Sequence, residues 1–473
     1  MSIVSTQQEQ NSAAAHQSSR SHLYLWLMFA LLVALMMSNY LSRQVVTVLF
    51  PFLKNDWSLS DAQLGSLVSV VALTVGLLSL PISLLVDRYG RVLGVTLMAL
   101  LWGAATILCA MAGNFMLLLV ARVLVGVAQA AFGSAGGAIL LGVFPARQHS
   151  TVMGAFLASA LFGSVFSIVL GGILAERYGW RTVFVVFGVT ALVVAALFRL
   201  VAREPETTHS QADAAPAKLP MRQALREVFS APTANYVYLG CGLQMFTVGA
   251  TIAWIPSYLN RYYAMEPSEA GLKAGLFVLV SAVGMTLGGA LVDRLARHAP
   301  ERKLGLTALY AGATMLLFIA AFSLEPGMLQ LLLVGAGMLL SGAHSGPSSA
   351  VATQVNDPRV HATVLAVIAL AISLLGMAPG PFVTGLIADF TDLSTAMAVM
   401  PLASLLAALC FLAANRHYHK DAQRFQLDPE SSIDALEAGC PSPSTSETHN
   451  QGQPANPEPP ATSILQTTHP ERS

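Results

Sequence analysis

The chain has 473 residues, of which 55% are apolar and only 11% are charged, against roughly a quarter charged in ordinary soluble domains. This composition excludes a soluble globular protein. The 25 basic and 25 acidic residues cancel, so the net charge gives no indication of a nucleic-acid partner. The four cysteines have neither a disulfide nor a ligand spacing, so we expect no metal site and no cofactor.

Twelve mainly apolar stretches follow along the chain. Each is long enough to cross a hydrocarbon layer of roughly 30 Å at about 1.5 Å per residue. The predicted spans are residues 23–53, 61–86, 92–112, 115–144, 150–175, 181–202, 233–262, 267–292, 304–323, 328–355, 362–388 and 394–414. The sequence therefore predicts an all-α membrane protein with twelve transmembrane helices.

The basic residues of the loops are unevenly divided between the two sides of the membrane. Eighteen fall on the side of the termini, five fall on the other side, and Arg43 and Arg122 fall inside spans. Because cytoplasmic loops carry the excess of Lys and Arg, we expect a multi-pass protein of the plasma (inner) membrane with both termini in the cytoplasm.

Five segments are predicted from the changes in composition. They are a polar cytoplasmic N-tail (1–22), an N-terminal six-helix bundle (23–202), a cytoplasmic linker (203–232), a C-terminal six-helix bundle (233–414) and a disordered cytoplasmic C-tail (415–473). The linker and the C-tail have too few apolar residues to offset the entropy lost on ordering.

An internal repeat relates the two bundles. After the second span, Ser83, Asp87 and Arg88 match Gly289, Asp293 and Arg294, which lie 206 positions later. At the end of the fifth span, Gly172, Ala175 and Glu176 match Gly385, Ala388 and Asp389, which lie 213 positions later. Landmarks that recur six helices apart indicate a duplicated six-helix unit, which is typical of secondary transporters with a substrate site between the repeats.

Several motifs resemble those of the major facilitator superfamily. They are the loop Asp87-Arg88-Tyr89-Gly90-Arg91 with its echo Asp293-Arg294, then Arg122 with Gly126 and Gln129, and then GWRTVF at 179–184. Further stretches resemble the spinster-like and organic anion:cation symporter branches, over about Leu23 to Ala414: NYLSR at 39–43, LSDAQLG at 59–65, WIPSYL at 254–259 and LLGMAPGP at 374–381.

The resemblance implies two pseudo-symmetric six-helix bundles and a substrate that is a lysolipid, a sphingoid phosphate or a small carboxylate. It also implies that Asp87 closes an inner gate against the start of the eleventh span. The gating residues that it implies are Asp87, Arg88, Arg91, Asp293 and Arg294. The chain departs from these relatives at Ser42 and Gln129, where they usually carry proton-binding carboxylates.

Arg43 and Arg122 are the main candidates for substrate binding. A cation inside the membrane is costly and needs a cavity or a partner, and no acid lies near the middle of any predicted span. We therefore expect an anionic substrate to supply the missing charge, because a guanidinium binds a carboxylate or a phosphate in a bidentate manner. For Arg122, hydrogen bonds to backbone carbonyls or a place in a hydrated gate are the alternatives.

Six further residues are candidates for orienting hydrogen bonds in the cavity. They are Asn39, Tyr40, Gln129, Gln244, Tyr258 and His344. Packing between helices is the alternative for each of them, and a place in the interfacial aromatic belt is a further one for Tyr258. His344 is also a candidate for proton coupling, because a histidine titrates near neutral pH.

The sequence thus predicts a secondary transporter that takes up a small organic anion, such as a sugar acid or an aromatic acid, by alternating access. Its expected partners are that substrate and the lipid bilayer, with a co-transported proton left open, and we expect a monomer. A proton-driven multidrug or metabolite exporter is one alternative, although Ser167-Ile168 replaces the usual Gly-Pro before Gly171-Gly172. A transporter-like sensor with a signalling tail is another. An enzyme is disfavoured because no nucleophile motif or metal spacing is found.

Overall fold

The computed structural model describes residues 2–202, 221–297 and 302–426. Within them, 12 helical segments are long and apolar enough to cross a membrane, which confirms the predicted fold class. These segments are Leu23–Trp57, Asp61–Tyr89, Arg91–Ala110, Phe115–Val143, Thr151–Tyr178, Trp180–Val201, Pro232–Tyr263, Pro267–Leu295, Arg302–Phe322, Met328–Gln354, Pro358–Phe390 and Leu393–Gln423. Residues 203–220 of the predicted linker and the tail beyond 426 lie outside the described residues, as do the side chains before Leu23.

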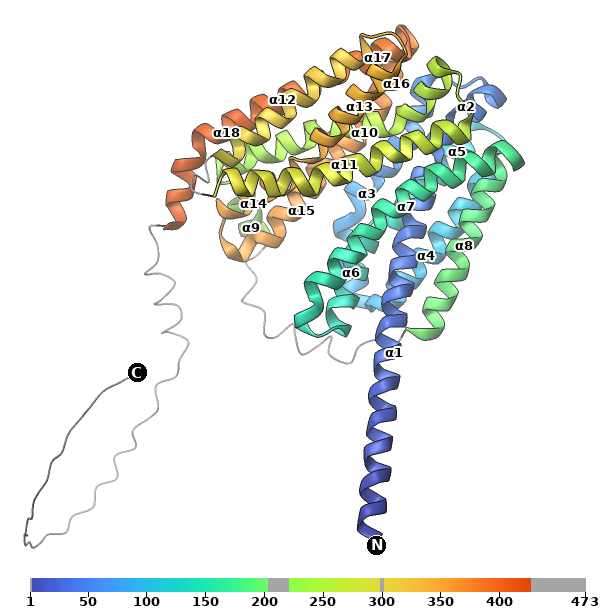
Figure 1. Cartoon of the computed structure of the whole chain (residues 1–473), viewed down its shortest axis with the longest axis vertical. Helices are drawn as coiled ribbons and strands as arrows, with labels where there is room; N and C mark the ends of the chain where they lie inside the picture. The colour runs from blue at the N-terminus through green and yellow to red at the C-terminus, as the bar shows by residue number, and fades with distance from the viewer. Residues whose placement is uncertain (1, 203–220, 298–301, 427–473) are drawn as a thin grey trace, which may run out of the picture. The chain divides into compact units, whose positions relative to one another are not determined.

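The first half of the chain forms one group of helices, drawn from blue to green in Figure 1. Its elements are α1 (Ser2–Gln44), α2 (Val46–Trp57), α3 (Asp61–Tyr89), α4 (Arg91–Ala110), α5 (Phe115–Gln129), α6 (Phe132–Val143), η1 (Ala146–Gln148), α7 (His149–Tyr178) and α8 (Trp180–Val201). The N-terminus of α3 is closed by a capping box, in which Ser60 and Gln63 each accept from the other's backbone N–H.

The second half forms the other group, drawn from green to red in Figure 1. Its elements are α9 (Met221–Val228), α10 (Pro232–Tyr263), α11 (Pro267–Leu295), α12 (Arg302–Phe322), α13 (Met328–Gly342), α14 (Ser345–Gln354), η3 (Pro358–Val360), α15 (His361–Ala371), η4 (Ile372–Met377), α16 (Pro379–Phe390), α17 (Leu393–Val399) and α18 (Leu402–Gln426).

Prolines explain why three spans of the second half are not continuous α-helices. The tenth span breaks between α13 and α14 just before Pro347, whose nitrogen has no hydrogen to donate to the preceding turn. The eleventh span widens into the π-helical segment η4 just before Pro379 and Pro381. The twelfth span breaks between α17 and α18 at Pro401. Such irregular backbone is tolerated within a membrane only where protein or a cavity covers it.

Helix extends into all three segments that the composition predicts to lie outside the bundles. Helix α1 begins at Ser2, within the predicted N-tail. Helix α9 lies within the predicted linker, and α18 continues beyond Ala414 to Gln426. The extension of α18 is held by Asp421, which is buried and accepts a hydrogen bond of 2.9 Å from the backbone N–H of Thr233. A tertiary contact therefore orders a segment whose composition alone predicts a tail.

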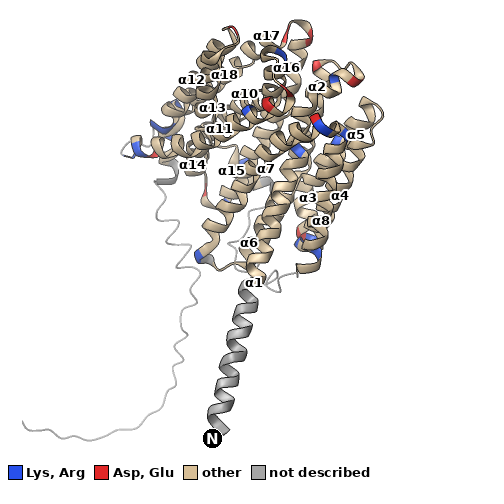
Figure 2. Cartoon of the chain, turned by 45° about the vertical axis from the view of Figure 1, so that its right-hand side comes forward, with Lys and Arg blue, Asp and Glu red and all other residues tan. Residues whose placement is uncertain are grey.

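Charged residues of the described chain lie mostly at helix ends and turns, as the blue and red segments of the ribbon in Figure 2 show. We use two names for the ends of the helical unit. The Asp61 end contains the connections from α2 to α3 and from α10 to α11, and the Asp87 end contains the connection from α3 to α4.

The buried apolar side chains form one cluster that joins the halves and two that do not. The joining cluster lies toward the Asp61 end and includes Phe50 of α2 and Trp254 of α10, whose ring centres are 5.0 Å apart. Toward the Asp87 end, one cluster around Trp102 and Phe156 lies within the first half and another around Phe411 lies within the second half. The halves are thus packed together chiefly at the Asp61 end.

Candidate functional site

Arg43 lies near the end of α1 and is only partly buried. Its guanidinium carbon is 5.9 Å from the ring centre of Tyr40, one helical turn earlier, in a cation–π contact. Within the part of the chain that the structure describes, no carboxylate forms an ion pair with Arg43. The structure therefore leaves this intramembrane charge available to a ligand.

Arg122 of α5 is in a different position, because it is completely buried and each of its three guanidinium nitrogens donates a hydrogen bond. Its Nε donates to the carbonyl of Leu67 at 3.0 Å, Nη1 to that of Ser42 at 2.8 Å and Nη2 to that of Arg43 at 2.8 Å. This geometry matches the alternative of backbone binding. Arg122 ties α5 to α1 and α3 and directly supports the backbone that carries Arg43.

Other predicted residues of the first half lie beside this pair of arginines. Gln129 Nε2 of α5 donates to the carbonyl of Asn39 at 3.0 Å. This hydrogen bond joins α5 to α1 at a second place, in addition to the bonds from Arg122. The buried Oε1 of Gln129 and hydroxyls of Ser38 and Ser42 have no hydrogen-bond partner among the described residues. Buried polar atoms of this kind are normally satisfied, so they indicate a place for water or for a polar ligand.

The predicted residues of the second half make their described contacts within that half. Tyr258 of α10 is buried against Tyr262 and Phe322, and its hydroxyl accepts from Gln330 Nε2 at 2.9 Å. Packing between helices accounts for these contacts of Tyr258.

Gln244 and His344 are almost fully buried and keep unsatisfied polar atoms. Neither amide atom of Gln244 has a partner in the described chain. His344 lies at the break between α13 and α14, where Nδ1 contacts the carbonyl of Ser341 at 2.8 Å and Nε2 has no described partner. These two side chains are therefore among the polar groups of the second half that could face a ligand or a water.

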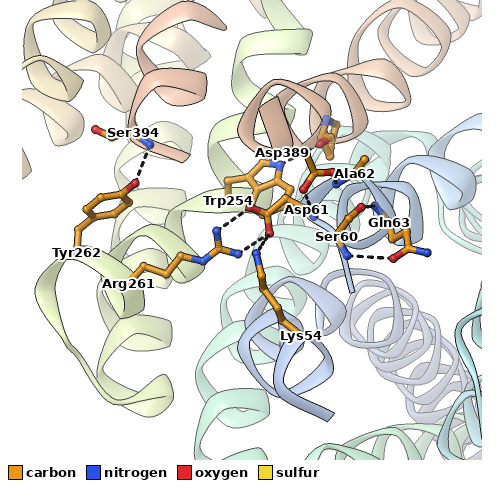
Figure 3. A network of polar contacts seen from close by, with 11 residues as sticks. Lys54, Ser60, Asp61, Ala62, Gln63, Trp254, Arg261, Tyr262, Asp389 and Ser394 are labelled. Carbon is orange, nitrogen blue, oxygen red and sulfur yellow. Dashed lines mark hydrogen bonds and ion pairs between the residues drawn. The ribbon is translucent and has the colours of Figure 1, made fainter. Parts of the chain in front are cut away.

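A network of charged residues, shown in Figure 3, joins the halves at the Asp61 end. Asp61 at the start of α3 is almost completely buried, and Arg261 near the end of α10 binds both of its carboxylate oxygens at 2.7 Å. Lys54 of α2 also binds Asp61 at 2.7 Å. The bidentate geometry is the strongest arrangement for such a pair, and it crosses from one half to the other.

Asp389 of α16 adds a second crossing contact in the same network. Its two carboxylate oxygens accept from the backbone N–H groups of Asp61 at 2.6 Å and of Ala62 at 2.9 Å. No function is predicted for these acids from the sequence, although Asp61 lies in the LSDAQLG stretch and Asp389 is a landmark of the repeat. The two acids are 328 positions apart and become partners only through the packing of the two halves.

The predicted gating residues lie at the opposite, Asp87 end. Asp87 accepts from Arg91 Nε at 2.9 Å, and Asp293 accepts from Lys303 at 2.9 Å. Both ion pairs lie within a single half. Arg88 is exposed beside Tyr89, and Arg294 is also exposed. The closure of Asp87 against the eleventh span stays a prediction.

Comparisons with known proteins agree with this architecture. The family model described as Major Facilitator Superfamily matches residues 32–381. The chain also resembles the solved structure of a bacterial homologue of the human lysosomal transporter Spinster in an inward-facing, unoccupied conformation, with a TM-score of 0.75 and 24% identity over 84% of this chain and 98% of that chain. At this identity the likeness shows the fold.

Curated relatives are transporters of different named activities. A protein of Mycolicibacterium smegmatis named MFS-type efflux pump is 27% identical over 81% of this chain and 91% of its own length. A hexuronate transporter of Bacillus subtilis is 25% identical over 80% of this chain and 91% of its own length. The matched family model covers most of the chain, so this protein is a non-enzymatic transporter that belongs to the Major Facilitator Superfamily.

Proposed function

We propose that this transporter carries a small organic anion, such as a sugar acid or an aromatic acid, and that Arg43 binds its carboxylate. The observation that carries the proposal is the partly buried guanidinium of Arg43, which has no anionic partner in the described chain. An unpaired cation in the membrane is costly, and a bound carboxylate removes that cost.

The neighbouring contacts support a binding role for this part of α1. Arg122 and Gln129 donate hydrogen bonds to the backbone carbonyls of Arg43 and Asn39 in α1. These bonds fix the position of the helix backbone that carries the Arg43 side chain. The unsatisfied hydroxyls of Ser38 and Ser42 supply further hydrogen-bonding groups on the same helix. We assign Arg122 and Gln129 mainly to positioning, and Tyr40 and Asn39 to contact with the substrate.

The relatives support the anionic class. The hexuronate transporter and a probable L-galactonate transporter of Escherichia coli, 26% identical over 55% of this chain, are both named for sugar acids. The excess of basic residues at the Asp87 end supports a cytoplasmic location of that end and of both termini, in the plasma (inner) membrane. Alternating access would then expose Arg43 to each side in turn.

The test is uptake of labelled glucuronate, an aromatic acid and a lysolipid into proteoliposomes, each with and without a pH gradient. Arg43→Met should abolish uptake of the carboxylates, and Arg43→Lys should retain part of it because the charge remains while bidentate binding is lost. Arg147→Gln, an exposed arginine of the Asp87 end, is the matched control. Undiminished uptake by folded Arg43→Met would refute the assignment.

A proton-driven exporter is the second candidate, and the similarity to the efflux pump of Mycolicibacterium smegmatis favours it. Comparing uptake with and without a pH gradient in the same experiment distinguishes the exporter from an anion symporter. An exporter moves its substrate against the proton flux, whereas a symporter moves the anion with it. His344 is our candidate for a protein-borne proton, and His344→Gln should flatten the pH profile of transport if the proton is carried there.

A transporter-like sensor is separated by truncation. A chain that ends after Arg424 should keep full transport, whereas a sensor would lose its output with the tail. Retained uptake by the truncated chain would exclude the sensor and leave the anion transporter and the exporter as the two candidates.

A further inference from the structure

The repeat landmarks at the ends of the fifth and eleventh spans meet the opposite half in the same way. Gly172 and Glu176 lie near the end of α7, and Gly385 and Asp389 lie near the end of α16. Both helix ends are at the Asp61 end, and each packs against the first turn of a helix from the other half. The two contacts can therefore be compared atom by atom.

In the first contact, α16 of the second half closes on α3 of the first. Asp389 accepts from the first two N–H groups of α3, those of Asp61 and Ala62. One turn earlier, a Cβ on Gly385 would collide with the carbonyl of Asp61. The absence of a side chain at Gly385 thus allows α16 to approach α3 closely. The Asp389 carboxylate accepts from N–H groups that have no partner within α3, and its negative charge lies at the positive end of the dipole of that helix.

In the second contact, α7 of the first half closes on α11 of the second. Glu176 accepts from the N–H of Ser268 at 3.3 Å. One turn earlier, a Cβ on Gly172 would lie 2.7 Å from the carbonyl oxygen of Pro267. The shift of 206 that relates the second and eighth spans carries Asp61 onto Pro267 and carries the next residue onto Ser268. The same contact is therefore built twice.

A second pair of glycines repeats the relation within each seam. A Cβ on Gly65 of α3 would collide with the carbonyl of Pro381, and a Cβ on Gly271 of α11 would lie 2.7 Å from that of Ile168. The same two shifts relate these positions as well. Each seam is thus a glycine-lined helix contact that ends in a carboxylate on a helix N-terminus.

We propose that Asp389 and Glu176 are gating residues, a duplicated pair of latches that hold the Asp61 end closed and separate together when that end opens. The latches are unequal for a chemical reason. Proline has no backbone N–H, so Glu176 accepts a hydrogen bond from only one N–H group at the start of α11. Asp389, by contrast, accepts from two N–H groups at the start of α3. The proposal rests on transport by this family and not on the identity of the substrate.

The experiment measures the distance across the Asp61 end by pulsed electron paramagnetic resonance in lipid nanodiscs without substrate. Spin labels are placed at Gly113→Cys and Glu325→Cys, which are exposed positions of opposite halves, in a background without the four native cysteines. A second pair at Gln148→Cys and Arg359→Cys, also exposed, reports on the Asp87 end.

Asp389→Asn keeps the shape of the side chain and removes its charge, so it should raise the ratio of open to closed populations by about 10-fold, as expected for loss of charged hydrogen bonds. Glu176→Gln should raise it by less than about 3-fold because its single bond is exposed. The distance across the Asp87 end should shorten in step. Glu269→Gln is the matched control, since Glu269 is an exposed acid of α11 that pairs with Lys273 on the same helix.

Identical distance distributions in Asp389→Asn, Glu269→Gln and the parent would overturn the proposal. Lengthening at the Asp61 end without shortening at the Asp87 end would also overturn it, because that result indicates local loosening and not a gate. The thermal midpoint of each variant, compared with the parent, confirms that the protein remains folded. All measurements omit the substrate, so a failed anion assignment for Arg43 would leave this test intact.

Discussion

Loss of the ion pair between Asp61 and Arg261 should shift the transporter toward opening at the Asp61 end. The perturbation is Arg261→Met, which keeps most of the side-chain volume and removes the charge. The side chain of Asp61 is 5% exposed and that of Arg261 is 26% exposed, and both nitrogen–oxygen distances are 2.7 Å. The pair joins α3 of one half to α10 of the other, so it exists only while this end is closed.

The expected magnitude lies between two limits. An exposed ion pair contributes about 0.2–1 kcal/mol, and breaking a buried pair costs about 3–5 kcal/mol. Lys54, which lies 2.7 Å from Asp61, is retained in the variant and should compensate part of the charge. We therefore expect a coupling of about 2 kcal/mol between Asp61 and Arg261, which is about 30-fold in the open-to-closed ratio.

The assay is a double-mutant cycle of Arg261→Met, Asp61→Asn and the two combined, read from the spin-label distance across the Asp61 end. If the pair acts as described, the combined variant should shift the ratio by far less than the product of the single shifts. Lys273→Met, which removes an ion pair within α11, is the control and should shift it by less than about 2-fold. Single shifts that combine additively to within about 0.5 kcal/mol would refute the reasoning.

Three further predictions concern single sites. Gly172→Ala should open the Asp61 end, because its Cβ would lie 2.7 Å from a carbonyl oxygen of α11, whereas Gly154→Ala on the same helix should not, because nothing lies within 4 Å. Arg122→Met should lower the free energy of unfolding by about 3 kcal/mol, because three carbonyls lose a charged donor, and Arg122→Lys should recover part of it. Hydrogen bonds from Thr395 hold the pKa of Asp392 below its ordinary value, so the stability it contributes is complete above that ordinary value and is lost as the pH falls through the lowered one.

Each of these outcomes has a direct check. The spin-label distance across the Asp61 end tests the prediction for Gly172→Ala and Gly154→Ala. Equal distances in these two variants would contradict the role of the close contact between α7 and α11. Chemical or thermal unfolding in detergent decides Arg122, where an unchanged midpoint would contradict the role of its carbonyl contacts. An acid titration of stability decides Asp392, because Asp392→Asn should remove that part of the pH dependence.

The sequence determined the membrane fold because hydropathy is a local property. A stretch of apolar residues long enough to cross a bilayer must be a helix, since every backbone polar group has to be satisfied within it. The predicted spans therefore agree with the helices to within a few residues, except where α18 continues past Ala414. The repeat and the place of Arg43 inside a predicted span could also be read directly from the residues.

The tertiary structure decided which polar groups have partners. Hydropathy and helical period indicate which face of a helix is buried but not which helix packs against it. The sequence therefore could not show that Arg122 binds carbonyls of α1 and α3 while Arg43 has no ion-pair partner among the described residues. For the same reason Asp61, Arg261 and Asp389, which lie at least 128 residues apart, form one network only through the packing of the two halves. A contact between helices depends on their crossing and rotation, and those are set by the whole bundle.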